Sequence, residues 1–279
     1  MARIRARETL RPDRLFADPY AQAFVDAAPG MFPPRAASPV ATPAQDARAR
    51  VGRSLYQRAV IRTRFYDEFL IAAAGEGCHQ VVLLAAGLDT RAFRLDWGEQ
   101  TRLFELDLPD VLAFKDRVLA QAGATARCTR TVVPADLRAD WPAELVRAGY
   151  APGAATAWLI EGLMFYLTPA EAGNLLAAVT GLSAAGGQLS FEHSPAGASA
   201  LVSRAQTMPA IHEYAELWKG GLGQDAPGWL AAHGWLARLH SLAAVARSYG
   251  REFAGTGGFL TARRESRGFA STAQQGQRG

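Results

Sequence analysis

The chain has 279 residues, of which 49% are hydrophobic and 20% are charged, a balance typical of a protein with a packed core and a polar surface. It contains no run of eighteen apolar residues, so we expect no transmembrane helix. Residues 1–14 are rich in arginine and lack the apolar stretch of a secretory signal, which predicts a cytoplasmic protein.

The cysteine and histidine content argues against a metal centre. Cys78 and Cys128 are the only cysteines, too few for a disulfide framework or a thiolate metal site. The five histidines never fall at the short spacing of a metal-binding pair on a helix. We therefore expect no metal cofactor.

The formal net charge of +4 raises the question of a nucleic-acid partner. Only Lys115 and Lys219 are lysines, and acidic residues are interspersed among the arginines along the chain. No dense basic block with interleaved aromatic residues is present. The charge pattern favours a mildly basic enzyme surface that binds a small-molecule substrate, with neither nucleic acid nor a membrane as the expected partner.

The first part of the chain is predicted to be mainly helical. A short apolar helical pattern precedes a Pro- and Ala-rich stretch at residues 29–43, which predicts a loop. Apolar positions then recur near helical spacing across residues 44–74, so one or two helices are expected there. We interpret residues 1–60, approximately, as a helical lid.

From about residue 80 onward, predicted strands and helices alternate. Short apolar runs predict strands at residues 81–84, 103–107, 131–134, 157–160, 188–193, 236–242 and 259–263. Helices are expected at residues 111–122 and 168–178, the second opening with a Thr168–Glu171 capping box. This alternation predicts an α/β fold with a doubly wound, mostly parallel sheet of seven strands, whose ligands bind at the carboxyl ends of the strands.

Two further segments stand outside this alternation. Residues 194–228 have a helical but irregular pattern, which predicts an insertion over the active site before the last strands. Residues 265–279 are polar and rich in Ser, Gln and Gly, a composition that predicts a disordered tail. Residues 1–264 are accordingly expected to form a single domain.

Two turns at strand ends carry residues that suit a nucleoside. Gly87 lies in the turn after the first strand, where a glycine lets the backbone approach a ligand closely. Asp107 ends the second strand, where a carboxylate can accept hydrogen bonds from both ribose hydroxyls. The spacing of twenty residues fits a strand–helix–strand unit. On these residues alone, a nucleoside site and an ordinary strand-end acid both remain open.

Five motifs follow one another in order between residues 8 and 264. They are Asp13-Arg14-Leu15-Phe16-Ala17-Asp18-Pro19-Tyr20, Arg62-Thr63-Arg64-Phe65, Gly87-Leu88-Asp89-Thr90-Arg91-Ala92-Phe93-Arg94-Leu95, Phe104-Glu105-Leu106-Asp107-Leu108-Pro109 and Glu161-Gly162-Leu163-Met164-Phe165-Tyr166-Leu167. Together they resemble the leucine carboxyl methyltransferase family, which includes a bacterial branch of polyketide-type O-methyltransferases. The resemblance implies a class I S-adenosylmethionine-dependent methyltransferase with S-adenosyl-L-methionine as its cofactor.

The resemblance also implies a role for individual positions. Arg62 would hold the carboxylate of the cofactor's amino-acid end, and Glu161 would take its ammonium group. Asp107 would hold the ribose, and Asp136 and Leu137 would flank the adenine. The full set implied for the cofactor is Arg62, Ala85, Gly87, Asp107, Asp136, Leu137 and Glu161.

Ala85 departs from the family pattern, which usually has glycine at this position. The added methyl group stands where the backbone approaches the cofactor. We expect it to weaken cofactor binding by about 1 kcal/mol if the site does not relax.

The expected reaction is methyl transfer to an oxygen of a small molecule, with a carboxylate of a secondary metabolite favoured because it is ionised at pH 7 and needs no base. By resemblance Arg138 is the candidate clamp for that carboxylate, and Tyr166 is a candidate hydrogen-bond donor. A phenol or alcohol acceptor would instead need a base. His193, at the end of the fifth predicted strand, is the candidate for that role.

Three other functions compete with this interpretation, one of them a cofactor-binding regulator that catalyses no reaction. The basic charge is compatible with a methyltransferase of RNA or of a modified nucleoside. A nicotinamide-dependent oxidoreductase would share the doubly wound sheet, but it requires a Gly-x-Gly-x-x-Gly turn that residues 85–90 do not supply. The sequence leaves the substrate and the oligomeric state open.

Overall fold

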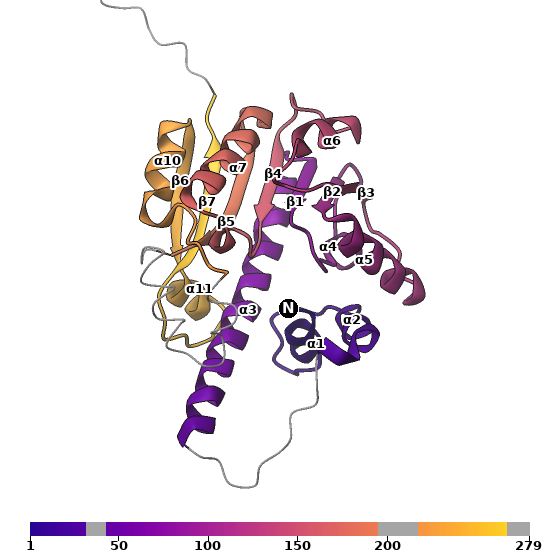
Figure 1. Cartoon of the computed structure of the whole chain (residues 1–279), viewed down its shortest axis with the longest axis vertical. Coiled ribbons are helices and arrows are strands. Elements are labelled where there is room, and N and C mark those ends of the chain that lie inside the picture. The colour runs from indigo at the N-terminus through magenta and orange to yellow at the C-terminus, as the bar shows by residue number, and fades with distance from the viewer. Residues whose placement is uncertain (32–42, 195–216, 267–279) are drawn as a thin grey trace, which may run out of the picture.

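A seven-stranded β-sheet forms the centre of the computed structural model, which describes residues 1–31, 43–194 and 217–266 (Figure 1). The strand order is β3-β2-β1-β4-β5-β7-β6. The strands are β1 (Gln80–Leu84), β2 (Arg102–Asp107), β3 (Thr129–Pro134), β4 (Thr156–Ile160), β5 (Gln188–His193), β6 (Trp235–Ser241) and β7 (Gly258–Arg264). Strands β1 to β5 pair in parallel, and β7 pairs antiparallel with β5 and β6. The predicted fold class is confirmed.

The helices are α1 (Ala2–Thr9), α2 (Ala21–Ala27), α3 (Pro43–Gly75), α4 (Arg91–Arg94), α5 (Pro109–Gln121), α6 (Trp141–Arg147), α7 (Pro169–Leu182), α10 (Ala226–Ala232) and α11 (Leu242–Ser248), with short 3-10 turns at Pro29–Met31, Met164–Tyr166 and Gly223–Asp225. The pattern over residues 44–74 is one helix of 33 residues, about 50 Å long. The capping box of α7 forms as predicted between Thr168 and Glu171. The sixth strand ends one residue earlier than predicted, because Ser241 caps α11.

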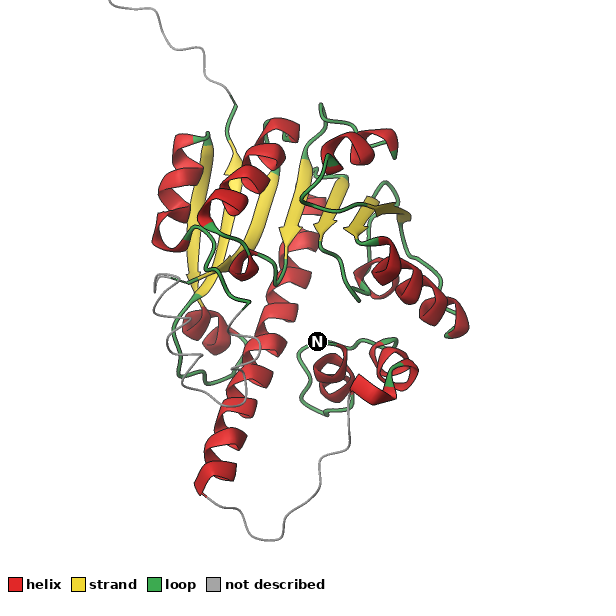
Figure 2. Cartoon of the chain, viewed as in Figure 1, coloured by secondary structure: helices red, strands yellow, loops and turns green. Residues whose placement is uncertain are grey.

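Helices cover both faces of the sheet, and each face has its own hydrophobic core (Figure 2). All five residues of β1 are buried. Val82 and Leu84 point into the core under α6, α7 and α10, whereas Val81 and Leu83 point into the core under α3, α5 and α11. A strand buried on both faces explains why β1 reads as a continuous apolar run rather than an alternating one.

The carboxyl ends of the parallel strands point toward the N-terminal helices α1 and α2 (Figure 2). Arg5 of α1 fastens these helices to the turn after β1, because its guanidinium pairs with Asp18 at 2.7 Å and donates a hydrogen bond to the carbonyl of Leu88 at 2.5 Å. The N-terminal segment is therefore held at the edge where ligands bind in such sheets. Its role as a lid stays a prediction.

Several expectations fall partly beyond the described residues. Residues 195–216 of the predicted insertion at 194–228 lie outside the described residues. So do residues 267–279 of the predicted disordered tail. The proposed single domain over residues 1–264 likewise stays a prediction. No helix among the described residues is long and apolar enough to cross a membrane.

The turn after β1 holds an unusual backbone conformation. Ala85 has a φ of 55°, the only positive φ at a non-glycine residue among those described. Its neighbour Ala86 donates a backbone hydrogen bond to Leu106 on β2, which fixes the turn against the sheet. A left-handed conformation brings the Cβ of an L-residue close to the backbone and costs about 1–2 kcal/mol.

We expect Ala85→Gly to raise the melting temperature by about 2 °C, because relief of the left-handed conformation outweighs the extra flexibility of glycine in the unfolded chain. Ala86→Gly is the control, since Ala86 does not have a positive φ, so this variant adds flexibility and loses a buried methyl group without relieving a left-handed conformation. It should lower the melting temperature. Differential scanning calorimetry of both variants tests this, and a lower melting temperature for Ala85→Gly would contradict it.

Candidate active site

The loops that carry the predicted site residues meet at one edge of the sheet. The register places Leu84 of β1 opposite both Leu106 of β2 and Ile160 of β4, and Leu106 opposite Val133 of β3, so strands β1 to β4 end at about the same level. The segments that continue from these ends carry Ala85 to Gly87 after β1, Asp107 at the end of β2, Asp136 and Leu137 after β3, and Glu161 after β4.

A large cavity opens beside these strand ends, with a volume of about 1190 Å³. It is lined by four of the seven residues predicted for the cofactor and by two of the three predicted for the acceptor, namely Ala85, Asp107, Asp136, Leu137, Arg138 and Tyr166. Apolar side chains of α6 and α7, including Trp141 and Leu175, form much of the remaining wall. The cavity combines a few polar groups with an apolar lining, as small-molecule sites usually do.

Asp107 is held in the cavity wall by the backbone on either side of it. Its Oδ2 accepts a hydrogen bond from the N–H of Gly87 at 2.6 Å, and its Oδ1 accepts one from the N–H of Leu108 at 2.7 Å. An ionised carboxylate has about four acceptor positions, so each oxygen can accept one more donor. Gly87 has a φ of 48°, which brings its N–H to Asp107 without the strain that a side chain would add.

Arg62 and Glu161 form an ion pair beside this turn. The Nε of Arg62 lies 2.9 Å from Oε1 of Glu161, and Nη1 donates to Oε1 of Glu192 at 2.5 Å. Burial opposes the charge on Arg62, but Glu161 and Glu192 outweigh it and raise its pKa above the ordinary value. Although Nε is close to Glu161, its N–H makes no hydrogen bond of good geometry among the described residues, so this contact is an ion pair without a well-directed hydrogen bond.

Arg91 connects this pair to the turn after β1. It is 2% exposed, and its guanidinium pairs with Oε2 of Glu161 at 2.8 Å, with Asp67 of α3 at 2.7 Å, and with Asp89. Burial by itself would raise the pKa of Glu161, but Arg91 and Arg62 lower it, so the carboxylate stays ionised. We call Arg62, Asp67, Asp89, Arg91, Glu161 and Glu192 the ion network.

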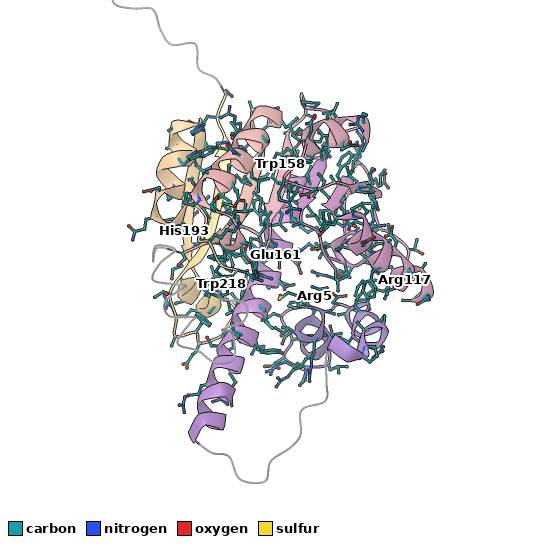
Figure 3. All side chains as sticks on the ribbon, in the orientation of Figure 1. Arg5, Arg117, Trp158, Glu161, His193 and Trp218 are labelled. Atoms are coloured by element: carbon teal, nitrogen blue, oxygen red, sulfur yellow. The ribbon has the colours of Figure 1, made fainter. Side chains whose placement is uncertain are left out.

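The sequence did not assign Arg91 or Glu192 to the site. Arg91 lies within the Gly-Leu-Asp-Thr-Arg motif, and its place in that motif could have indicated that it belongs to the site. Glu192 is an acid near the end of a predicted strand, one residue before His193. The same feature was the reason to predict a ligand-binding role for Asp107, so it was also a signal at Glu192. Figure 3 places Glu161 between the edge of the sheet and the N-terminal helices, with Arg5 below it and His193 to one side.

Arg138 and Asp136 pair with each other at the mouth of the cavity. The Nη2 of Arg138 lies 2.6 Å from Oδ2 of Asp136, and the Arg138 side chain is 79% exposed. Hydrogen bonds from Arg138 lower the pKa of Asp136 to about 2. Tyr166 is exposed and lines the same cavity, as does Lys219. Arg138 therefore lines the cavity but is paired with a neighbouring acid.

His193 lies apart from the large cavity. It is 7% exposed and lines a separate recess of about 20 Å³, room for about one water molecule. Burial lowers its pKa, so the imidazole is neutral at pH 7. Within the described ranges, no three His, Cys, Asp or Glu side chains gather in a way that could hold a metal ion.

Comparison with known proteins gives consistent matches. The family model described as leucine carboxyl methyltransferase matches residues 1–180. A protein of Frankia alni is 49% identical over 269 residues, covering 95% of this chain and 92% of that protein. One of Parafrankia sp. is 47% identical over 268 residues, covering 94% of this chain and 84% of that protein.

A solved structure from Thermobifida fusca has a TM-score of 0.54 and 15% identity, covering 95% of each chain, which shows a shared fold. All three proteins are named as putative methyltransferases, and the names of the first two add that they depend on S-adenosyl-L-methionine.

The ion network predicts an acid-sensitive contribution to stability. Burial raises the pKa of Asp89, but the charges of Arg91, Lys115 and Arg94 outweigh it and hold the pKa at about 2. Because the folded pKa lies below the unfolded value near 4, the contribution is complete above about pH 4 and is lost as the pH falls toward 2.

We expect Asp89→Asn to lower the free energy of unfolding by about 2 kcal/mol at pH 6 and by much less at pH 2.5. Urea titrations at both pH values measure this difference. Asp96→Asn removes an exposed carboxylate outside the network and serves as the control. An equal loss for Asp89→Asn at both pH values would show that its ionisation does not stabilise the fold.

Proposed function

Because the chain belongs to the leucine carboxyl methyltransferase family and is an S-adenosylmethionine-dependent methyltransferase, we propose that it methylates a carboxylate oxygen of a small molecule and forms a methyl ester. The observation that carries this proposal is that two acids lining the cavity are poor bases, because hydrogen bonds lower the pKa of Asp136 to about 2 and also lower that of Glu171. Arg138 and Lys219 line the same cavity, each paired with an acid, and are the cations that an anionic acceptor would meet.

The ion network suits the amino-acid end of the cofactor. The Nε of Arg62 lies 2.9 Å from Glu161 but makes no well-directed hydrogen bond, and a carboxylate is the acceptor that a guanidinium binds best. Glu161 lies beside the same Nε and offers an oxygen to an ammonium group. These two observations support Arg62 and Glu161 as the ligands of the amino-acid end.

The strand ends suit the nucleoside part. The free acceptor positions of Asp107 match the two ribose hydroxyls, and Asp136 with Leu137 lines the cavity where adenine would lie. The backbone of Ala85 and Gly87 would support the link between the two ends. We keep the seven positions implied by the family as the proposed cofactor set.

The bound cofactor supplies an electrophilic methyl carbon on a sulfonium group, so the acceptor needs alignment more than activation. An acceptor carboxylate is already ionised at pH 7. Tyr166 would donate a hydrogen bond that orients it, and Lys219 or Arg138 would attract its charge. The apolar walls from α6 and α7 would hold its carbon skeleton and exclude water.

The ionisable groups of the cavity are poor bases for a neutral acceptor. Asp136 has a pKa of about 2, and hydrogen bonds from Thr168 lower the pKa of Glu171. His193 is neutral and could accept a proton, but it lines a different recess. These observations support a carboxylate acceptor over a phenol or an alcohol.

A screen with cofactor carrying a labelled methyl group tests the proposal. Small carboxylic acids, phenols and alcohols, and RNA are offered as separate acceptors. Label that enters an acid and is released as methanol by mild base supports a methyl ester. Base-stable label on a phenol, or label on RNA, would overturn it.

Asp107→Ala should weaken the binding of S-adenosylmethionine by about 1.5 to 3 kcal/mol, because charge-assisted hydrogen bonds to the ribose are lost. Isothermal titration calorimetry measures the affinity. Asp110→Ala, an exposed acid three residues along the same segment, should leave it unchanged. Equal affinity for wild type and Asp107→Ala would refute the ribose assignment.

Arg138→Ala should lower kcat/KM for a carboxylic acid by about fivefold and leave the cofactor Kd within about twofold. The cofactor is spared because Asp136, freed from its partner, is still ionised at pH 7. Arg147→Ala removes another exposed arginine of the same region and should change neither value. A cofactor Kd that worsens as much as turnover would assign Arg138 to the cofactor instead.

A further inference from the structure

We propose that Glu192 is a positioning residue that fixes Arg62 for the carboxylate of the cofactor and so makes the enzyme select ligands with an amino-acid end. The inference rests on the proposed role of Arg62 and Glu161. It adds a residue that does not itself touch the cofactor and acts through Arg62. No motif that carries the family resemblance includes Glu192.

Glu192 is a buried carboxylate whose two oxygens both accept hydrogen bonds. It lies near the end of β5 and is 4% exposed. Both of its oxygens accept the N–H of Gly162, at 3.0 and 2.9 Å, and Oε1 also accepts from Nη1 of Arg62 at 2.5 Å. Gly162 comes directly after Glu161, so Glu192 joins the backbone beside one ligand to the side chain of the other.

The strand register explains this arrangement. Ile160 of β4 lies opposite Phe191 of β5, so Glu161 and Glu192 follow at the same level on neighbouring strands. Two adjacent carboxylates repel each other unless a cation lies between them. Arg62, reaching the sheet edge from α3, is that cation.

The two carboxylates hold Arg62 differently. Glu192 has a side-chain exposure of 2% and is fixed by two backbone contacts, whereas Glu161 has an exposure of 19% and meets the Nε of Arg62 without a well-directed hydrogen bond. Arg91 holds the other oxygen of Glu161. The contact between Arg62 and Glu161 is therefore the one that can open for a ligand, while the contact with Glu192 keeps the guanidinium in place.

Gly162 shows how closely the parts fit. Its φ is 75°, and a Cβ added there would lie 3.6 Å from Nη1 of Arg62. The left-handed conformation turns its N–H toward Glu192 in a space that Arg62 also fills. Without the charge of Glu192, Arg62 would be free to pair fully with Glu161, and the two ligands of the amino-acid end would neutralise each other.

The test compares two ligands that share the nucleoside. S-Adenosylhomocysteine carries the amino-acid end, and 5′-methylthioadenosine lacks it. Titration calorimetry gives both affinities for wild type, Arg62→Ala, Glu192→Gln and the control Glu144→Gln, an exposed acid of α6. We expect Glu192→Gln to weaken the binding of S-adenosylhomocysteine by about tenfold, while the affinity for 5′-methylthioadenosine changes by less than about twofold. Glu144→Gln should change neither affinity.

The outcomes separate the two proposals. If Arg62→Ala loses no preference for S-adenosylhomocysteine, the proposed role of Arg62 is wrong. Suppose that Arg62→Ala loses the preference for S-adenosylhomocysteine. If Glu192→Gln then keeps that preference, or if it weakens the binding of both ligands equally, only the proposed role of Glu192 is wrong. Should Glu192→Gln fail to fold, Glu192→Asp decides, because a shorter carboxylate cannot reach both Gly162 and Arg62. An unchanged preference in that variant contradicts the proposal.

Discussion

The site is organised around Arg91, a guanidinium that is almost completely removed from water and faces three carboxylates. An unpaired charge in such a place would cost several kcal/mol, so its partners must arrive together in the folded chain. They come from α3, from the turn after β1 and from the loop after β4. Arg91 therefore sets the distance between the long helix and the edge of the sheet, and Arg62 is carried into position by the same helix.

Ionic groups at this edge of the sheet fix the orientation of the elements, which hydrophobic packing alone does not. The two cores hold the sheet between its helical layers, but apolar contacts do not specify direction. Paired guanidinium and carboxylate groups do, because their hydrogen bonds have a fixed geometry. The same groups that brace α3 against β4 and β5 also present a buried donor and a carboxylate side by side. In the proposed site, structural support and recognition of a zwitterion would thus come from one network.

The turn after β1 links this network to the cavity. Ala85 lines the cavity, Gly87 donates to Asp107, and Asp89 pairs with Arg91, all within five residues. Ala85 has a conformation that glycine would adopt without strain. The departure from the family pattern therefore has a local cost in the fold, in addition to the methyl group it places near the proposed cofactor site.

Much of the fold followed from the sequence because the signals are local. Apolar runs marked all seven strands, helical spacing marked α3, and Thr168 with Glu171 marked the start of α7. The twenty residues between Gly87 and Asp107 fitted a strand–helix–strand unit, and in the structure the two residues are joined by a hydrogen bond. Each of these features depends on residues close in the chain or within one strand–helix–strand unit.

The partners of the charged groups were decided only by the tertiary structure. Arg62 and Glu192 are 130 residues apart, and they meet because β5 lies next to β4 in the sheet. The pairing of Arg138 with Asp136 and the separation of His193 from the cavity likewise depend on where loops fold, which periodicity does not encode. Sequence determines which segments become strands and helices. Strand order and register determine which charges share a site, because ion pairs depend on distance in space and not along the chain.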